Sequence, residues 1–354
     1  MMTTKDDDNL IFSGLSDAER EAKKGKAEEE RLLLMREYVR LLSETTRDPD
    51  FSGMTEAERS AEAERLRREA LEEARRLETA GDSKGGKWKE GEARILDFDP
   101  KQGGIYFNRR ADVYLPTFDH DEESPFGPMR FTDAVYRKNQ TVKLCGALNI
   151  LSVKIACSDV GYPIKDNPLI LTGPKRGLAL LDDNFVEIDL KIKDRQGQDR
   201  ELGEGVVRIR AKTVVSLEKC KFESKSLATR LSTVDVNYAV VKGAVEATIA
   251  FEVLEGDFVG KITAHTTGIK KSVVLYDSKV AGDGHGALQV MRPVVSVHVK
   301  VKLVIVAKTG DGGESDRRIV AFTTRVKGRD EEVIDVGAAK MSVKVAWSIM
   351  DPSR

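Results

Sequence analysis

From Thr141 to the end of the chain, apolar residues recur at every second position between short turns, and no other feature constrains the fold as strongly. The segments 234–240 and 245–253 show the pattern most clearly, on either side of a turn at residues 242–244. Because successive side chains of a strand point to opposite faces, this period predicts half-buried antiparallel strands. In the second segment Glu246 and Glu252 take the alternate positions, so we expect them to face solvent.

The same alternation recurs at 186–192, 262–266, 295–305 and 343–349. Gly- and Asp-rich turns separate these runs, and no helical period longer than two turns interrupts them. Many short strands at this spacing predict a mainly β fold, an antiparallel β-sandwich over residues 105–354. A nucleotide-binding α/β fold, which alternates strands with amphipathic helices, is excluded. In the last run Trp347 shares the apolar face with Val343 and Val345, which predicts a core position.

Residues 1–80 differ in composition, with 21 acidic and 15 basic residues and few β-branched ones, which favours helix or disorder. The motif FSGLSDAER recurs there as FSGMTEAER. In each copy a hydroxyl residue, Ser16 or Thr55, precedes a glutamate by three positions, as in a capping box. We therefore predict two helices, from Ser16 to about Glu44 and from Thr55 to about Thr79.

Two interpretations of this charged arm stay open. In the first, the helices form a hairpin whose narrow apolar seam, which includes Leu32 and Met35, associates as a coiled coil with a partner or a second copy. In the second, the arm is a solvated tail that is helical only in part and otherwise disordered. Residues 81–104, rich in Gly and Lys, then form a linker, and we expect proteolysis between Gly81 and Gly91.

The composition of the whole chain excludes several classes of protein. Lys and Arg number 58 against 59 Asp and Glu, so the basic excess typical of nucleic-acid binding is missing. Three cysteines are too few for a disulfide-stapled secreted scaffold. The start MMTTKDDDNL is unlike a secretory signal, and no window reaches the roughly 18 apolar residues of a membrane helix. We expect a cytoplasmic protein with neither nucleic acid nor membrane as partner, and a nuclear location stays open.

The four histidines do not form a metal-ligand pattern. His265 and His298 alternate with apolar residues in strand-like runs, so we interpret both as exposed strand positions. His285 lies in a Gly-rich turn, and no His-x-His or Cys-x-x-Cys spacing supplies further ligands. His120 lies among the carboxylates of residues 119–123, which we interpret as a solvated acidic loop because the EF-hand spacing of a Ca²⁺ site is absent.

The cysteines and a glycine-rich segment also predict no catalytic site. Cys145, Cys157 and Cys220 each lie in a strand-like run, and the alternation places Cys157 on an apolar face, where a free thiol acts as a small hydrophobe. The segment GPKRG, residues 173–177, has the composition of an anion nest, but no P-loop or dinucleotide fingerprint surrounds it, so we interpret it as a cationic hairpin tip. We therefore predict no catalytic, cofactor-binding or metal-binding residue, and no cofactor.

Several long phrases of the chain resemble a plant family that is expanded in grasses, the domain of unknown function family 6598. They are FDHDEESPFGPMR (Phe118–Arg130), SVKIACSDVGYPI (Ser152–Ile164), LILTGPKRGLALLDD (Leu169–Asp183), DLKIKDRQGQDREL (Asp189–Leu202), LATRLSTVDV (Leu227–Val236), VLYDSKVAGDG (Val274–Gly284) and KMSVKVAWS (Lys340–Ser348). The resemblance implies no particular activity, because the family has none assigned. Some members are joined to a ribosome-inactivating N-glycosidase domain, which implies a stress or defence setting.

The resemblance also exposes a difference after Ile164. Family members usually carry about thirty further residues between Ile164 and Asn167, and without the two strands that these would form a sheet edge is left unpaired. We expect that edge beside the apolar run Val153–Cys157, where it would recruit another chain.

The N-glycosidase domain itself is absent from this chain. Such domains are expected to carry a Glu and an Arg one turn apart on a core helix, beside tyrosines and a tryptophan. Glu72 and Arg75 have that spacing, but it recurs throughout the charged arm. Trp88 lies in the expected linker and Trp347 in the last strand-like run, so neither tryptophan supports such a site. We predict no N-glycosidase activity.

These observations favour a non-catalytic binding or interaction module whose ligand or partner is unknown. Self-association through the helical arm or the exposed strand edge is part of that expectation. The first alternative is an accessory domain that binds a carbohydrate or other small ligand through its loops. The second is a hydrolase that uses the carboxylates of residues 119–123, although an enzyme needs titratable groups that converge in a pocket.

Overall fold

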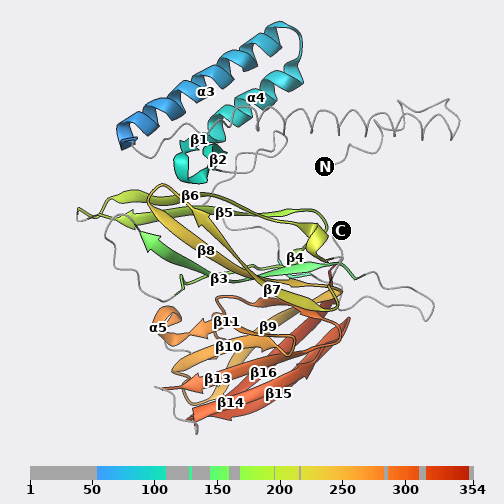
Figure 1. Cartoon of the computed structure of the whole chain (residues 1–354). Helices are drawn as coiled ribbons and strands as arrows, with labels where there is room; N and C mark the ends of the chain where they lie inside the picture. Colours follow the sequence, from blue (N-terminus) through green and yellow to red (C-terminus); the bar gives the residue numbers. More distant parts are fainter. Residues whose placement is uncertain are drawn as a thin grey trace, which may run out of the picture. The chain divides into compact units, whose positions relative to one another are not determined.

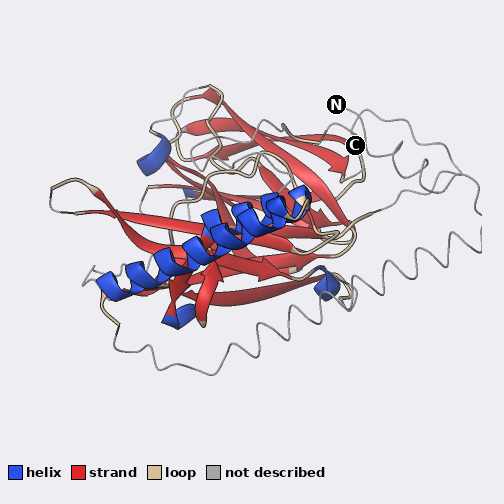
Figure 2. Cartoon of the chain, turned by 90° about the horizontal axis from the view of Figure 1, so that it is seen from above, coloured by secondary structure: helices blue, strands red, loops and turns tan. Residues whose placement is uncertain are grey.

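The computed structural model describes residues 54–108, 127–129, 144–158, 168–194, 196–214, 217–282, 286–310 and 316–350. Strands dominate this part of the chain, and every strand pair in it is antiparallel (Figures 1 and 2). The predicted mainly β fold, preceded by helix, is therefore confirmed. The predicted helix that begins at Ser16 lies outside the described residues. No helix in the described part is long and apolar enough to cross a membrane.

Helix α3, Glu56–Thr79, begins and ends where the sequence predicts. Thr55 is the N-cap, and both halves of the capping box form, because the Thr55 Oγ1 accepts from the Glu58 amide and the Glu58 carboxylate accepts from the Thr55 amide. The helix buries a thin stripe of small residues that includes Ala63 and Ala74.

The expected linker over residues 81–104 is instead largely regular structure. Helix α4, Ser83–Ile95, packs against α3, and the Asp82 carboxylate accepts from the Gly85 amide at its start. A Cβ at Gly86 would lie 2.4 Å from the Glu78 Cγ and 3.1 Å from the Ala74 carbonyl oxygen, so this glycine lets the two helices approach. Gly86, one of the glycines that suggested a flexible linker, thus serves close packing. Residues 55–354 form one compact unit, which begins well before the predicted domain start at residue 105.

A short hairpin follows the helices. Strand β1, Leu96–Asp99, pairs with β2, Gly104–Phe107, and a single 3₁₀ turn η1, Pro100–Gln102, connects them. The Arg67 Nε of α3 donates to the Leu96 carbonyl at 3.1 Å and ties the hairpin to the helix.

Two four-stranded sheets pack face to face as the predicted sandwich. One has the order β12 (Val294–His298), β9 (Ala244–Glu255), β16 (Ala339–Ile349), β15 (Gly328–Val336). The other has the order β11 (Ile269–Asp277), β10 (Gly260–Thr266), β13 (Lys302–Thr309), β14 (Arg317–Thr323), and the short helix α5 (Ser278–Ala281) follows β11. Their inner faces share one apolar core, in which Trp347 is fully buried as predicted.

The remaining strands form a second packing with its own core. The sheet β4 (Leu178–Ala179), β3 (Ala147–Ser158), β8 (Ser232–Val241), β7 (Cys220–Ala228) packs against the two-stranded ribbon β5 (Asn184–Lys193), β6 (Asp199–Ile209), which the 3₁₀ turn η2 (Ala211–Val214) follows. The sequence predicts a single sandwich over this region, whereas the described residues form two large apolar cores and one small apolar cluster. The predicted β8–turn–β9 arrangement is confirmed, and Gly243 has a positive φ in the turn.

The two packings meet through polar groups and through a small apolar cluster that joins Ala147 and Val241 to Ala244 and Met350. The Asn149 side chain of β3 forms two hydrogen bonds with the Ser296 backbone of β12, accepting from the amide at 2.9 Å and donating to the carbonyl at 2.8 Å. Glu246, predicted to face solvent, is completely buried on β9. Its carboxylate accepts from the amides of Met129 and Gly177 at 2.8 and 2.7 Å. The prediction for Glu246 was wrong because a further segment covers that face of the sheet.

The predicted strand edge beside Val153 is partly covered. The Leu169 amide donates to the Val153 carbonyl at 2.8 Å. The guanidinium of Arg292, a buried residue, donates to the Ile150, Leu151 and Gly173 carbonyls. Beyond Val153, no partner strand is described on this side of β3, and residues 159–167 lie outside the described residues.

Candidate ligand-binding cleft

Two of the histidine sites considered from the sequence, His120 with the carboxylates of 119–123 and His285, lie outside the described residues. His298, predicted to be exposed, is buried, because the sheet that carries β3 covers the polar face of β12. Its Nδ1 donates to the Lys242 carbonyl, and its buried Nε2 has no hydrogen-bond partner in the described part of the chain. His265 is half-buried. Burial, together with the charge of Arg317, lowers the pKa of His265.

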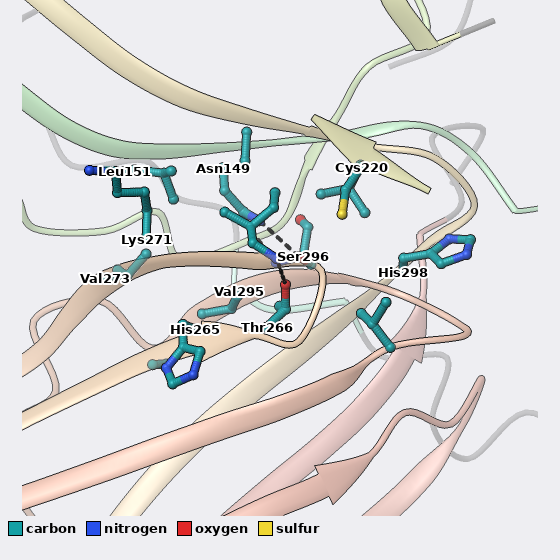
Figure 3. Close-up of a pocket in the computed structure, with 15 residues that line it drawn as sticks. Asn149, Leu151, Cys220, His265, Thr266, Lys271, Val273, Val295, Ser296 and His298 are labelled. Carbon is teal, nitrogen blue, oxygen red and sulfur yellow. Dashed lines mark hydrogen bonds between the residues drawn. The ribbon is translucent and has the colours of Figure 1, made fainter. Parts of the chain in front are cut away.

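Both histidines line a cavity of about 20 Å³, which has room for one water molecule (Figure 3). The two imidazoles lie on opposite sides of it and do not converge on one point (Figure 3). Cys220 also lines this cavity, and burial raises the pKa of its thiol, which makes it a poor nucleophile. Within the described ranges no group of three or more His, Cys, Asp or Glu side chains is placed to hold a metal ion.

Cys157 and the GPKRG segment differ from their predicted settings. Cys157 is exposed, because a register shift in the pairing of β3 with β8 between Ile155 and Cys157 breaks the alternation. The GPKRG segment, 173–177, is no hairpin tip, since it runs along the sandwich and gives its Gly177 amide to the Glu246 carboxylate. The anion that this segment binds is thus a side chain of the protein itself.

A larger cleft, of about 650 Å³, lies between the η1–β2 segment and the strands β5, β6 and β7. Volumes of this size are typical of small-ligand sites, which are mostly apolar with a few placed polar groups. Its lining has that character, with three aromatic rings and five side chains able to form hydrogen bonds, one of which is the Tyr106 hydroxyl. The lining residues are Lys101, Gln102, Tyr106, Phe107, Phe185, Val206, Arg208, Ser226, Leu227 and Ala228.

Strand geometry positions the floor of the cleft. Phe185 of β5 is the cross-strand partner of Arg208 on β6, and Val206 lies two residues before Arg208 on the same face. The Asp183 carboxylate holds the Arg208 guanidinium, with a 2.6 Å hydrogen bond from Nε, and also accepts from the Ala211 amide. One edge of the floor is therefore a fixed, charge-paired arginine beside an aromatic ring.

Gly205 permits the close approach of the opposite wall. It has φ +154°, and a Cβ there would lie 2.9 Å from the Gln102 Oε1 and 3.0 Å from the Leu227 Cδ2. The Gln102 Nε2 donates to the Glu204 carbonyl at 2.9 Å. A Cβ at position 205 would force the ends of the Gln102 and Leu227 side chains to shift, so glycine lets both side chains pack against β6.

Carboxylates gather behind this wall, where the hairpin meets β6. Asp97 and Asp99 of β1 are buried, and Glu201 and Glu204 of β6 are half-buried. Arg230 bridges hairpin and strand, with its guanidinium 3.6 Å from both the Asp97 and the Glu201 carboxylates. We call Asp97, Asp99, Glu201, Glu204 and Arg230 the seam cluster.

The seam cluster has more acid than base, and this shifts its ionisation. Burial first, and then the charges of Glu201, Asp97 and Asp189, raise the pKa of Glu204 to about 7. Burial also raises the pKa of Glu201, against the opposing effect of Arg230. The Tyr106 pKa is raised as well, by burial and by the nearby charge of Asp97.

Sequence reasoning did not find this cleft. Its residues come from three separate stretches, 101–107, 185–208 and 226–228, and the first of these was interpreted as linker followed by the start of the sandwich. The aromatic pair Tyr106-Phe107 next to a Gly-Gly turn is the one local signal that could have indicated it.

Comparison with known proteins adds one match. The family model described as "Domain of unknown function (DUF6598)" matches residues 164–345, more than half of the chain. The matched range contains β5, β6 and β7, and therefore the floor of the cleft, but not the η1–β2 wall. No curated protein has a sequence similar to this one.

Proposed function

Because this chain belongs to the DUF6598 family, whose description names no function, we propose a function from the cleft. The protein acts as a non-catalytic binding module that takes a small ligand between η1–β2 and the β5–β6 ribbon. The observation that carries the proposal is the cleft of about 650 Å³ with the rings of Tyr106, Phe107 and Phe185 in its lining. Aromatic side chains bury large areas at little entropic cost and orient a ligand through their faces.

A carbohydrate or similar polyhydroxylated ligand fits this lining best. Its apolar C–H face would stack on the rings, while Gln102, Arg208 and Ser226 offer donors and acceptors to hydroxyl groups. A binding role without chemistry is supported by the pairing of Arg208 with Asp183, which leaves that cation as a fixed recognition group. The hydrolase alternative receives no such support, because its carboxylates at 119–123 lie outside the described residues.

The wider setting is part of the proposal and rests on sequence alone. We place the protein in the cytoplasm, in a plant stress or defence process, as the family resemblance implies. Association with a protein partner through the helical arm or a strand edge remains compatible with a ligand in the cleft.

Binding to a ligand panel tests the proposal. Isothermal titration with mono- and oligosaccharides, and with aromatic acids as a second class, should identify a ligand that Phe185→Ala weakens by about tenfold or more. Phe222→Ala is the matched control, since Phe222 is an exposed phenylalanine on β7 outside the cleft, and it should leave affinity unchanged. If every ligand found binds Phe185→Ala as tightly as the unaltered chain, the cleft is not the site.

A further inference from the structure

Both charged side chains among the described lining residues of the cleft are cations. Lys101 belongs to η1 and Arg208 to β6, and no carboxylate of the described residues lines the cleft with them. The Lys101 Nζ is held in place, because it donates to the Arg230 carbonyl at 3.0 Å. A ligand that carries a negative group therefore meets opposite charge in this lining.

The Arg208 guanidinium is held on one side and has a nitrogen to spare. Its Nε donates to the Asp183 Oδ2 at 2.6 Å, and its Nη2 lies 2.5 Å from the same oxygen. The other Asp183 oxygen accepts from the Ala211 amide at 2.9 Å, so Asp183 is itself fixed. Within the described ranges Nη1 has no hydrogen-bond or ion-pair partner. Because Asp183 already orients the guanidinium, an anion that pairs with Nη1 immobilises no further side chain.

An aromatic ring lies beside this guanidinium. Phe185 and Arg208 are cross-strand partners on the β5–β6 ribbon, so their Cβ atoms project from the same face about 5 Å apart. Both side chains line the cleft. A ligand ring stacked on Phe185 therefore brings a substituent on its edge within reach of Arg208.

Two further cations lie at the Arg208 end of the cleft. Arg210 follows two residues after Arg208, and its charge acts on Asp183. The Lys225 Nζ of β7 donates to the Arg208 carbonyl. These charges offset those of Asp183 and of its exposed neighbour Asp182, so Arg208 keeps its attraction for an anion.

The acidic residues of the same ribbon face lie farther along the floor. Glu187 is the cross-strand partner of Val206, and Glu204 lies two residues before Val206, about 13 Å from Arg208 along the strand. Neither glutamate lines the cleft. The face thus changes sign from its Arg208 end to its Glu204 end, and it orients an anionic ligand with the charged group at Arg208.

We propose that the cleft selects a ligand with a carboxylate on a ring, bound with the ring against Phe185 and the carboxylate on the Arg208 guanidinium. This inference rests on the proposed function and narrows its ligand class. A carboxylate accepts a charge-assisted hydrogen bond from Nη1, which is stronger than the bond that a neutral hydroxyl group accepts. Two kinds of molecule carry this chemistry, a sugar of the uronic acid type and an aromatic acid.

Isothermal titration of the full chain with two matched pairs of probes tests the inference. Digalacturonate is compared with galactobiose, and cinnamate with cinnamyl alcohol, so that each pair differs in its charged group. In at least one pair the acid should bind about tenfold more tightly than its neutral counterpart. That preference should shrink as sodium chloride is raised from about 0.05 M to about 0.5 M, because salt screens an exposed charge. The pair that shows the preference identifies the source of the carboxylate.

Arginine variants locate the preference. Arg208→Gln should abolish it, and Arg208→Lys, which keeps a positive charge, should retain part of it. Arg200→Gln is the matched control, because the Arg200 Nε likewise donates to a fixed carboxylate, that of Asp194, at 3.0 Å on the same ribbon but outside the cleft. This control should keep the full preference.

The outcomes separate this inference from the proposed function. Equal affinities within both pairs, each weakened by Phe185→Ala, would overturn the inference and leave the proposed function intact. A preference that survives in Arg208→Gln would also overturn it, because the carboxylate would then bind elsewhere. Affinity that depends on Arg208 but not on Phe185 would contradict the proposed function and leave the anion at Arg208. Absence of binding by all four probes would contradict both.

Discussion

Replacement of Trp347 by alanine tests the main core most directly. The side chain is fully buried between the two sandwich sheets, with neighbours that include Val245 and Val343 in the same cluster. Its indole Nε1 also donates to the Asp330 carboxylate at 2.7 Å, and Arg325 pairs with that carboxylate at 2.9 Å. Removal of so large a buried ring leaves a cavity that the neighbouring strands cannot fill.

We expect Trp347→Ala to lower the free energy of unfolding by about 3–5 kcal/mol, from the lost transfer free energy and the cavity. Trp347→Phe should lose about 1–3 kcal/mol, because a ring remains while the Asp330 carboxylate loses a donor and keeps Arg325. The assay is reversible denaturant unfolding followed by far-ultraviolet circular dichroism, since Trp347 is one of only two tryptophans and fluorescence would change with the mutation itself. Leu254→Ala, at an exposed apolar position of β9, is the matched control and should cost less than about 0.5 kcal/mol. A loss below about 1 kcal/mol for Trp347→Ala would refute the reasoning and place that face in solvent.

Three further outcomes are expected. Asn149→Ala should lower the free energy of unfolding by about 2–3 kcal/mol in the same assay, because it leaves the Ser296 amide and carbonyl without these hydrogen bonds in the junction between the two packings. Asn237→Ala, which removes a side-chain amide that donates to the Ser152 hydroxyl, should lower it by less. Because Glu204 binds its proton more tightly in the folded state, its contribution to stability is fully present below about pH 4.5 and is lost as the pH rises through about 7. The difference in unfolding free energy between the unaltered chain and Glu204→Gln should therefore change by about 1 kcal/mol over that window, allowing for solvent screening. Incubation of ribosomes with the protein, followed by aniline treatment, should release no rRNA fragment, and a fragment that disappears with Glu72→Gln would contradict this.

The position of the N-terminal boundary shows where composition misleads. Thr55 and Glu58 predict the start of α3 because a capping box is a local device that needs only four residues. The glycines of 81–91 look like linker for an equally local reason, namely that glycine lowers helix propensity. The role of Gly86 in the contact of α4 with α3 depends on Ala74 and Glu78, one helix earlier. Limited proteolysis of the full chain should therefore spare residues 83–95.

The cleft was beyond sequence reasoning for a related reason. Each of its walls is an ordinary piece of strand or turn, and the cavity exists only where tertiary packing brings η1 and β2 beside β5, β6 and β7. The half-buried position of Glu204 among like charges likewise carries no signal in the sequence, where it is one acid among many. Its surroundings come from β1, β5 and the turn before β8.

The alternation of apolar residues determined the mainly β, antiparallel fold and the face that each strand turns to its nearest core, because period two is a property of the strand itself. Trp347 was assigned to the core on that basis alone, and it lies there. What the opposite face meets was decided only by the tertiary structure. His298, Ser296 and Glu246 occupy polar positions of β12 and β9, yet all three are buried, since the β3 sheet and the 127–129 and 177 segments lie over them. Polar residues can be buried wherever hydrogen-bond partners arrive from elsewhere in the chain, and a pattern within one strand carries no record of those partners.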